Sequence, residues 1–242
     1  MSGLFVHSYL PVPRARVPSW VAQVPAFRAL QHRGRIPLRQ QITCLTGENG
    51  VGKSTLLEGI AVSCGFNSAG GAFTSQVRER ENPLRGVAAV ARGNRAMEGY
   101  FLRAESHFSV AGRYNRDHAG VDLHRLSHGE SVLHIVQESF HAQGLYLLDE
   151  PESGLSLIRQ MTLLAELHQV AAAGAQIILV THSPVLLALP GARILEFTTE
   201  GDMLELELEQ TTSHRALRDF LADPRGIADY MVEVTRACLL KP

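Results

Sequence analysis

The sequence predicts an α/β protein, with a mostly parallel central sheet flanked by helices. Two continuous apolar runs, at residues 145–148 and 176–181, have the composition of strands that are buried on both faces of a parallel sheet. Residues 156–173 lie between them and are expected to form a helix that Gly174 ends. Strands that alternate with helices in this way are typical of layered α/β domains.

The stretch 47–55 is the strongest motif in the chain, because it follows the pattern G-x-x-x-x-G-K-S. A β-branched run at 42–46 precedes it and residues with helical spacing follow it, so it lies between a strand and a helix. Glycines let backbone N–H groups turn toward an anion, and the helix N-terminus adds positive potential. The residues predicted to bind nucleotide phosphates are Gly47, Glu48, Asn49, Gly50, Val51, Gly52, Lys53, Ser54 and Thr55.

Further elements follow from local patterns along the chain. Residues 3–12 predict an edge strand, and 13–37 allow no assignment. Residues 66–98 predict an irregular segment with one short helix, and 107–125 predict a loop. Residues 128–143 predict a helix that Gly144 ends. Other predicted elements are strands at 42–46, 99–103, 193–197 and 203–209, and helices at 213–222 and 226–240.

Composition excludes several classes of protein. The formal net charge is −1 and hydrophobic residues make up 45% of the 242 residues, as in soluble globular domains. Three scattered cysteines form no C-x-x-C pair, so neither a zinc site nor a disulfide framework is indicated. No apolar run reaches the ~18 residues that a bilayer span needs, and no signal sequence is evident, so we expect no membrane insertion and a cytoplasmic location.

Charge is uneven along the chain, since residues 1–47 contain six arginines and no acidic residue. One interpretation is an arginine-rich surface beside a phosphate site. The other is a nucleic-acid-binding patch. The sequence favours the first and leaves the second open.

Acidic residues and a histidine end two predicted strands. Asp149 ends the run at 145–148, where a carboxylate suits a Mg²⁺ shell, and Ser54 offers a hydroxyl ligand. Glu150 is next along, where a carboxylate can polarise the water that attacks a γ-phosphate. His182 follows the run at 176–181 and can donate a hydrogen bond to the same phosphate. We expect Glu150 and His182 to be catalytic, and Ser54 and Asp149 to hold the metal.

The start of the helix at 128–143 permits two interpretations. Ser127 and Glu130 have the spacing of a capping box, which explains them structurally. Alternatively, this helix N-terminus binds a phosphate, but not the one held by the phosphate loop of its own chain. In that case Ser127, His128, Gly129 and Glu130 form the site.

Together these motifs resemble the ABC-type ATPase family, over residues 40–200. Residues 47–54 match its Walker A loop, 126–131 its signature, 146–150 its Walker B strand and 152–156 its D-loop, and His182 falls at the switch histidine. The chain is similar to the small stand-alone bacterial members often labelled AAA family ATPases, which carry Ser-His-Gly-Glu and Leu-Arg-Ala-Glu-Ser segments. The resemblance implies a P-loop NTPase fold with an N-terminal antiparallel strand portion and a small helical or irregular insertion.

The resemblance also implies activity, cofactors and assembly. It implies hydrolysis of ATP with Mg²⁺, by a homodimer that forms around ATP. Residues 1–242 are expected to form one domain, with a subdomain at about 66–140. The alternatives are a nucleotide-gated interaction module in DNA maintenance or phage defence, with an unidentified effector or partner protein, and the motor subunit of a membrane transporter.

One family feature is not evident, namely the glutamine of the Q-loop. By chain order it should follow the strand at 99–103, where Arg103 and Glu105 stand instead. We expect one of these two residues to lie near the γ-phosphate or its metal. His128 and Glu130 also replace the glycine and glutamine of the usual signature.

Overall fold

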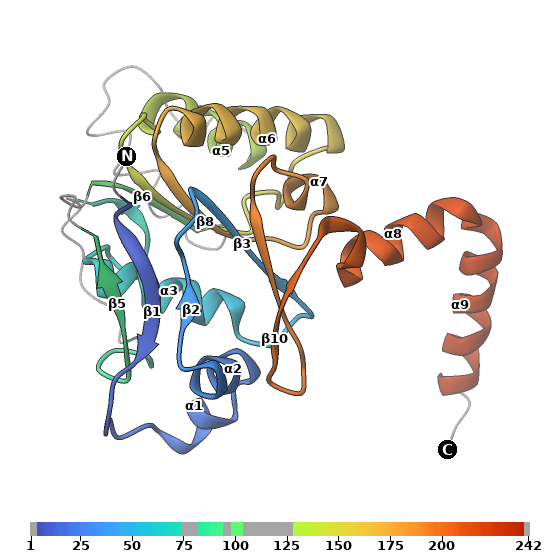
Figure 1. Cartoon of the computed structure of the whole chain (residues 1–242). Coiled ribbons are helices and arrows are strands. Elements are labelled where there is room, and N and C mark those ends of the chain that lie inside the picture. Colours follow the sequence, from blue (N-terminus) through green and yellow to red (C-terminus); the bar gives the residue numbers. More distant parts are fainter. Residues whose placement is uncertain (1–3, 74–81, 94–97, 104–127, 240–242) are drawn as a thin grey trace.

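The structure is a computed structural model that describes residues 4–73, 82–93, 98–103 and 128–239 (Figure 1). Its centre is a seven-stranded sheet in which the order of strands is β10-β9-β3-β8-β7-β6-β4. The five inner strands run parallel, and the two edge strands β4 and β10 run antiparallel to their neighbours. The strands are β3 (Ile42–Gly47), β4 (Gly71–Ala72), β6 (Gly99–Arg103), β7 (Leu145–Asp149), β8 (Gln176–Val180), β9 (Arg193–Phe197) and β10 (Met203–Leu206). The predicted mostly parallel α/β architecture is therefore confirmed.

A second, antiparallel sheet packs near the first, in the order β2-β1-β5. Its strands are β1 (Val6–Pro11), β2 (Ile36–Pro37) and β5 (Ala88–Arg92). The helix α3 (Lys53–Cys64) lies between the two sheets and contacts strands of both. Gly59 of α3 permits this packing, because a Cβ there would stand 2.4 Å from the hydroxyl oxygen of Tyr9 on β1.

Two apolar cores cover the two faces of the central sheet, because side chains alternate along each buried strand. One core joins the sheet to α1 (Ser19–Gln23), α2 (Pro25–Arg33), α3 and the antiparallel sheet. The other joins it to α5 (His128–Ser139), α6 (Leu157–Ala172) and α7 (Pro184–Leu187). The helices α3 and α5 therefore lie on opposite faces of the sheet.

A buried glutamine links the two sheets. The Gln176 side chain, at the start of β8, is 1% exposed. Its Oε1 accepts hydrogen bonds from the backbone N–H groups of Phe5 and Val6, both at 2.9 Å. Its Nε2 donates to the carbonyl oxygens of Val6 and Leu38, both at 2.8 Å. One side chain thus satisfies backbone groups on two segments about 170 and 138 positions away in sequence.

We expect Gln176→Leu to lower the free energy of unfolding by about 2 kcal/mol, because buried backbone groups would lose their partners. Urea denaturation followed by circular dichroism measures this loss. Gln137→Leu is the matched control, since the Gln137 side chain lies on the exposed face of α5, where its Nε2 donates to Oε1 of Glu166. Equal stability of the two variants would show that the link between the sheets contributes little.

The chain ends in two helices, α8 (Thr212–Ala222) and α9 (Pro224–Leu239), which follow a short 3-10 turn at Leu208–Gln210. Figure 1 shows them leading away from the body of the molecule, and α8 buries none of its residues. The start of α8 is held by a carboxylate. Glu196 of β9 accepts hydrogen bonds from the N–H and hydroxyl of Thr212, at 2.9 and 2.6 Å. Of the helices that the structure describes, none combines the length and hydropathy needed to cross a bilayer.

The structure corrects several local predictions. The strand β1 is the middle strand of its sheet, not an edge, since it pairs with both β2 and β5. Residues 88–92 form a strand, and no helix occurs in the described part of 66–98. The helix α5 ends at Ser139 rather than at Gly144, and Leu208–Gln210 is a 3-10 turn rather than strand. The predicted loop at 107–125 lies outside the described residues.

Candidate functional site

The phosphate loop joins β3 to α3, as predicted, at the carboxyl edge of the parallel strands. Gly47 ends β3 with φ 133°, and a Cβ there would stand 2.1 Å from the carbonyl oxygen of Phe197 on the neighbouring strand. Only glycine therefore fits at this position. Residues 24–26 support the loop from outside, since the Ala26 N–H donates to the Val51 carbonyl at 2.8 Å.

Lys53 closes the loop from within. Its side chain is buried, and Nζ donates to the carbonyl oxygens of Gly47 and Glu48 at 2.9 and 2.8 Å. Burial lowers the pKa of the Lys53 ammonium, whereas the carboxylates of Glu150 and Asp149 act to raise it. Those two acids provide the charge balance for a cation held at the loop.

Ser54 and Asp149 meet where α3 begins and β7 ends. The Ser54 hydroxyl donates to Oδ1 of Asp149 at 2.8 Å, although the residues are 95 positions apart. A hydroxyl and a carboxylate are oxygen ligands of the kind that Mg²⁺ prefers, and Mg²⁺ typically takes its remaining ligands from phosphates and water. Among the described residues no group of three or more His, Cys, Asp or Glu side chains could hold a metal alone. The pair therefore fits a Mg²⁺ that arrives with a nucleotide.

Glu150 leaves β7 in a strained conformation. Its φ is 47°, one of two positive values among the non-glycine residues described. Its N–H donates to the Val180 carbonyl at 2.9 Å, so the backbone is tied to β8 while the side chain turns out of the strand. Such strain is common at functional positions, where surrounding contacts hold it in place.

His182 faces Glu150 across the ends of β7 and β8. Its Nε2 lies 3.7 Å from Oε1 of Glu150, and no hydrogen-bond partner for Nε2 is found among the described residues. Burial and the nearby Lys53 ammonium lower the pKa of the imidazole below its ordinary value of 6.5, against the opposing effect of Glu150. This shift favours the neutral imidazole, which has one N–H to donate.

A small pocket of about 140 Å³ adjoins His182 and the start of the phosphate loop. Its other walls come from Glu196 and from the first turn of α8, including Ser213 and Ala216. The C-terminal helices therefore begin beside the residues that the sequence places at the γ-phosphate.

The start of α5 carries the signature-like residues. Ser127 and the side chain of His128 lie outside the described part of the chain, so the capping box stays a prediction. Gly129 packs so closely on the loop after β7 that a Cβ would stand 2.6 Å from Cδ2 of Leu155. Glu130 accepts a hydrogen bond from Nη2 of Arg159 at 3.1 Å, so a cation accompanies this carboxylate.

Of the two Q-loop candidates, only Arg103 lies among the described residues. Arg103 ends β6 opposite Asp149 in the strand register. Its guanidinium pairs with Glu58 of α3 at 2.7 Å and donates to the Ser68 carbonyl at 2.8 Å. Glu105 lies outside the described residues. The place of either residue beside a γ-phosphate stays a prediction.

Sequence reasoning missed Glu152, whose carboxylate contacts the loop that carries His182. No local pattern distinguishes it, since its partners are 29 to 31 positions away. The aromatic side chains of the N-terminal segment, any of which could stack on an adenine, differ in exposure. Tyr9 and Phe27 are core residues, whereas Trp20 is 57% exposed on α1.

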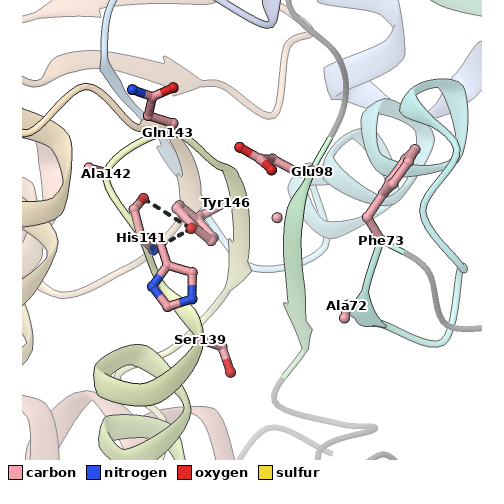
Figure 2. A pocket seen from close by; sticks show the side chains of 9 residues that line it. Ala72, Phe73, Glu98, Ser139, His141, Ala142, Gln143 and Tyr146 are labelled. Carbon is pink, nitrogen blue, oxygen red and sulfur yellow. Dashed lines mark hydrogen bonds between the residues drawn. The ribbon is translucent and has the colours of Figure 1, made fainter.

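A larger pocket, of about 460 Å³, lies at the opposite end of β7 (Figure 2). Figure 2 shows Tyr146 beside His141, whose N–H donates to the tyrosine hydroxyl at 2.5 Å while that hydroxyl donates to the His141 carbonyl at 3.1 Å. Asp149 is three residues further along the same strand, about 10 Å at ~3.3 Å per residue. The phosphate site and this pocket are therefore at different edges of the sheet.

Comparison with protein families adds to this geometry. A family model described as "AAA domain, putative AbiEii toxin, Type IV TA system" matches residues 72–188, and a second model, described as an AAA domain, matches residues 24–104. Between them, the two matches contain the phosphate loop, the start of α5, Glu150 and His182. Both models describe AAA domains, and the chain is similar to them over residues 24–188.

Individual relatives of this chain are distant. The ABC transporter G family member STR2 of Medicago truncatula is 25% identical over 178 residues, which are 59% of this chain. The matched region spans 24% of that relative's length.

Solved structures similar to this chain include one described as "An inward-facing conformation of a putative metal-chelate type ABC transporter", at 17% identity and a TM-score of 0.49, over 90% of this chain and 88% of that one. A second is the SMC head domain from Thermotoga maritima, at 12% identity and a TM-score of 0.45, over 84% of this chain and 100% of that one.

Proposed function

We propose that this chain binds Mg·ATP on residues 47–55 and hydrolyses it to ADP and phosphate. The observation that carries the proposal is the 2.8 Å contact between the Ser54 hydroxyl and Asp149, because it joins the phosphate loop to the strand that presents Glu150. A Mg²⁺ bound by these two oxygens would neutralise charge on the β- and γ-phosphates.

Each remaining residue has a role that follows from its position. Lys53 offers a buried ammonium to the β- and γ-phosphate oxygens. Glu150 accepts a hydrogen bond from the attacking water and directs it at the γ-phosphorus. A bond forms between the water oxygen and phosphorus while the bond to the β–γ bridging oxygen breaks, so that ADP leaves with that oxygen. Glu150 takes the proton of the water, and His182 donates a hydrogen bond to the transferred phosphoryl group. Catalysis arises from positioning and charge stabilisation.

Release of inorganic phosphate from Mg·ATP by the purified chain tests the proposal directly. We expect release by the wild-type protein to exceed that by Glu150→Gln. Equal release by both would contradict the assignment of the site.

We also propose a homodimer that forms around two ATP molecules. The whole chain, residues 1–242, is taken as one ABC-type ATPase domain, with about residues 66–140 as a subdomain. The helices α3 and α5 pack on opposite faces of the sheet, which favours contact of α5 with a nucleotide held by a second copy. The Glu130–Arg159 pair supports this arrangement, because it lessens repulsion between Glu130 and a triphosphate. Such an interface is isologous, so one kind of chain suffices.

Light scattering of Glu150→Gln tests the dimer, because this variant should hold ATP without consuming it. We expect a monomer mass without nucleotide and twice that mass with saturating Mg·ATP. Gly129→Leu is the informative partner variant, since its side chain would obstruct the start of α5, and it should stay monomeric in the same background. A monomer mass for Glu150→Gln at saturating ATP would refute the dimer and leave Glu130 with a structural role.

The second candidate function is a nucleotide-gated interaction module, in DNA maintenance, phage defence or transport, whose output is assembly rather than turnover. The observation that favours it is the exposed apolar surface of α9 and of α8, the helix that begins beside the site. The large apolar side chains exposed there are Leu217, Phe220, Leu221, Tyr230, Met231, Val232 and Val234. ATP-dependent dimerisation combined with turnover far below about 1 s⁻¹, the low end for typical enzymes, would favour this second candidate.

A further inference from the structure

We propose that Glu152 is a positioning residue, and that one oxygen of its carboxylate sets the place of His182 beside Glu150. This inference rests on the proposed hydrolysis. The inference goes beyond that function by naming the contact that holds His182 beside Glu150.

Three hydrogen bonds converge on a single oxygen of Glu152. Oε1 of Glu152 accepts from the Thr181 hydroxyl at 2.6 Å, from the His182 N–H at 2.8 Å and from the Ser183 N–H at 3.2 Å. All three donors are consecutive residues in the loop that leaves β8. Hydrogen bonds to an ionised carboxylate are about twice as strong as neutral ones, so this loop is fixed relative to the loop after β7.

Glu152 itself lies in a hydrogen-bonded turn. The turn after β7 is closed by the Ser153 N–H, which donates to the Glu150 carbonyl at 3.0 Å, and by the Leu155 N–H, which donates to the Glu152 carbonyl at 2.9 Å. Pro151 fixes the backbone φ between Glu150 and Glu152. Glu150 and the residue that anchors His182 are therefore two positions apart in one rigid turn.

The backbone of His182 connects the Glu152 carboxylate to the imidazole. The His182 N–H is one of the three donors, so its Cα and ring follow the Glu152 carboxylate. The ring ends with Nε2 at 3.7 Å from Oε1 of Glu150. A displacement of about 1 Å at such a site can cost on the order of 10²-fold in rate.

The other side of the same loop has a separate anchor, which supplies a matched control. The Ser183 hydroxyl donates to Oε1 of Gln160 at 2.7 Å, and Gln160 in turn donates to the Leu155 carbonyl at 3.1 Å. This anchor holds the start of α7 and makes no contact with the His182 backbone in the contacts described. Gln160→Leu therefore removes a hydrogen bond from the loop without releasing the histidine.

A double-mutant cycle tests the proposal. We expect Glu152→Ala to lower kcat for ATP by about 10- to 100-fold with KM changed less than about 3-fold, because ATP binding does not need the histidine in place. Glu152→Gln keeps an acceptor oxygen and should recover most of this loss. In a His182→Ala background, Glu152→Ala should cost less than about 3-fold more, since the residue that it positions is gone. Gln160→Leu should leave kcat within about 3-fold of wild type.

Effects of Glu152→Ala and His182→Ala that multiply would overturn the proposal, as would a kcat unaffected by His182→Ala. The NMR signal of the His182 ring, assigned by its loss in His182→Gln, gives a readout without hydrolysis. We expect it to shift or broaden in nucleotide-free Glu152→Ala but not in Gln160→Leu. Absence of phosphate release by the wild type would defeat the proposed function alone, and the ring signal would still decide whether Glu152 positions His182.

Discussion

Lys53→Ala is expected to abolish ATP binding, with an affinity loss on the order of 10³-fold, or ~4 kcal/mol. The Lys53 ammonium is buried inside the loop and donates to the Gly47 and Glu48 carbonyls. Without it, a β,γ-phosphate pair would keep the backbone N–H groups of the loop but would lose the ammonium that offsets the carboxylates of Asp149 and Glu150. Titration with a fluorescent ATP analogue measures the affinity.

Arg92→Ala is the control for charge alone. The Arg92 guanidinium caps the other end of α3, where it donates to the Ser63 and Cys64 carbonyls at 2.9 and 3.2 Å. The loss of this side chain, which belongs to β5, removes one positive charge beside the same helix and should leave ATP affinity unchanged. If Lys53→Ala bound the analogue as tightly as Arg92→Ala, the phosphate-loop assignment would be wrong.

Glu150→Gln should separate binding from chemistry. Glutamine has the shape of glutamate and preserves the strained backbone, but it lacks the charge that polarises water. ATP affinity should persist, while kcat falls by roughly 10²-fold or more, the scale of general-base contributions. Single-turnover measurements with Mg·ATP distinguish the two effects.

Glu205→Gln makes the same chemical change on β10, where the Glu205 side chain is 58% exposed and pairs with Arg193. Its turnover should equal that of the wild type. Wild-type turnover in Glu150→Gln would mean that another group directs the water, and His182, at 3.7 Å from Glu150, would be examined next.

The parts of the fold that the sequence predicts well are those set by local patterns. The phosphate loop is contiguous, and its glycines, lysine and flanking apolar runs suffice to place β3, the loop and α3. Buried parallel strands such as β7 and β8 are uninterrupted apolar runs, which few other structures produce. Ser156 is the N-cap of α6 and Gly65 is the C-cap of α3, and both residue types are common at these positions.

The parts that could not be predicted depend on contacts between distant segments. The middle position of β1 arises from pairing with β5, some 80 residues further along, and no periodicity in 6–11 reveals it. The helices α1 and α2 begin just after Pro18 and at Pro25, and with 5 and 9 residues they are too short to be stable without the core against which they pack. The three donors to Glu152 and the cation beside Glu130 are likewise side-chain contacts across the fold, so a motif search finds the residues but not their partners.

The order of strands in the central sheet has a consequence for how the chain is made. The strand that leads into the phosphate loop, β3, pairs only with β8 and β9 in its sheet, which begin at Gln176 and Arg193. During synthesis from the N-terminus, the loop emerges well before either neighbour, so its strand has no partner in the sheet until β8 has left the ribosome and is paired on both sides only after β9. Nucleotide therefore cannot stabilise the early nascent chain, and the binding site is among the last features of the molecule to be completed.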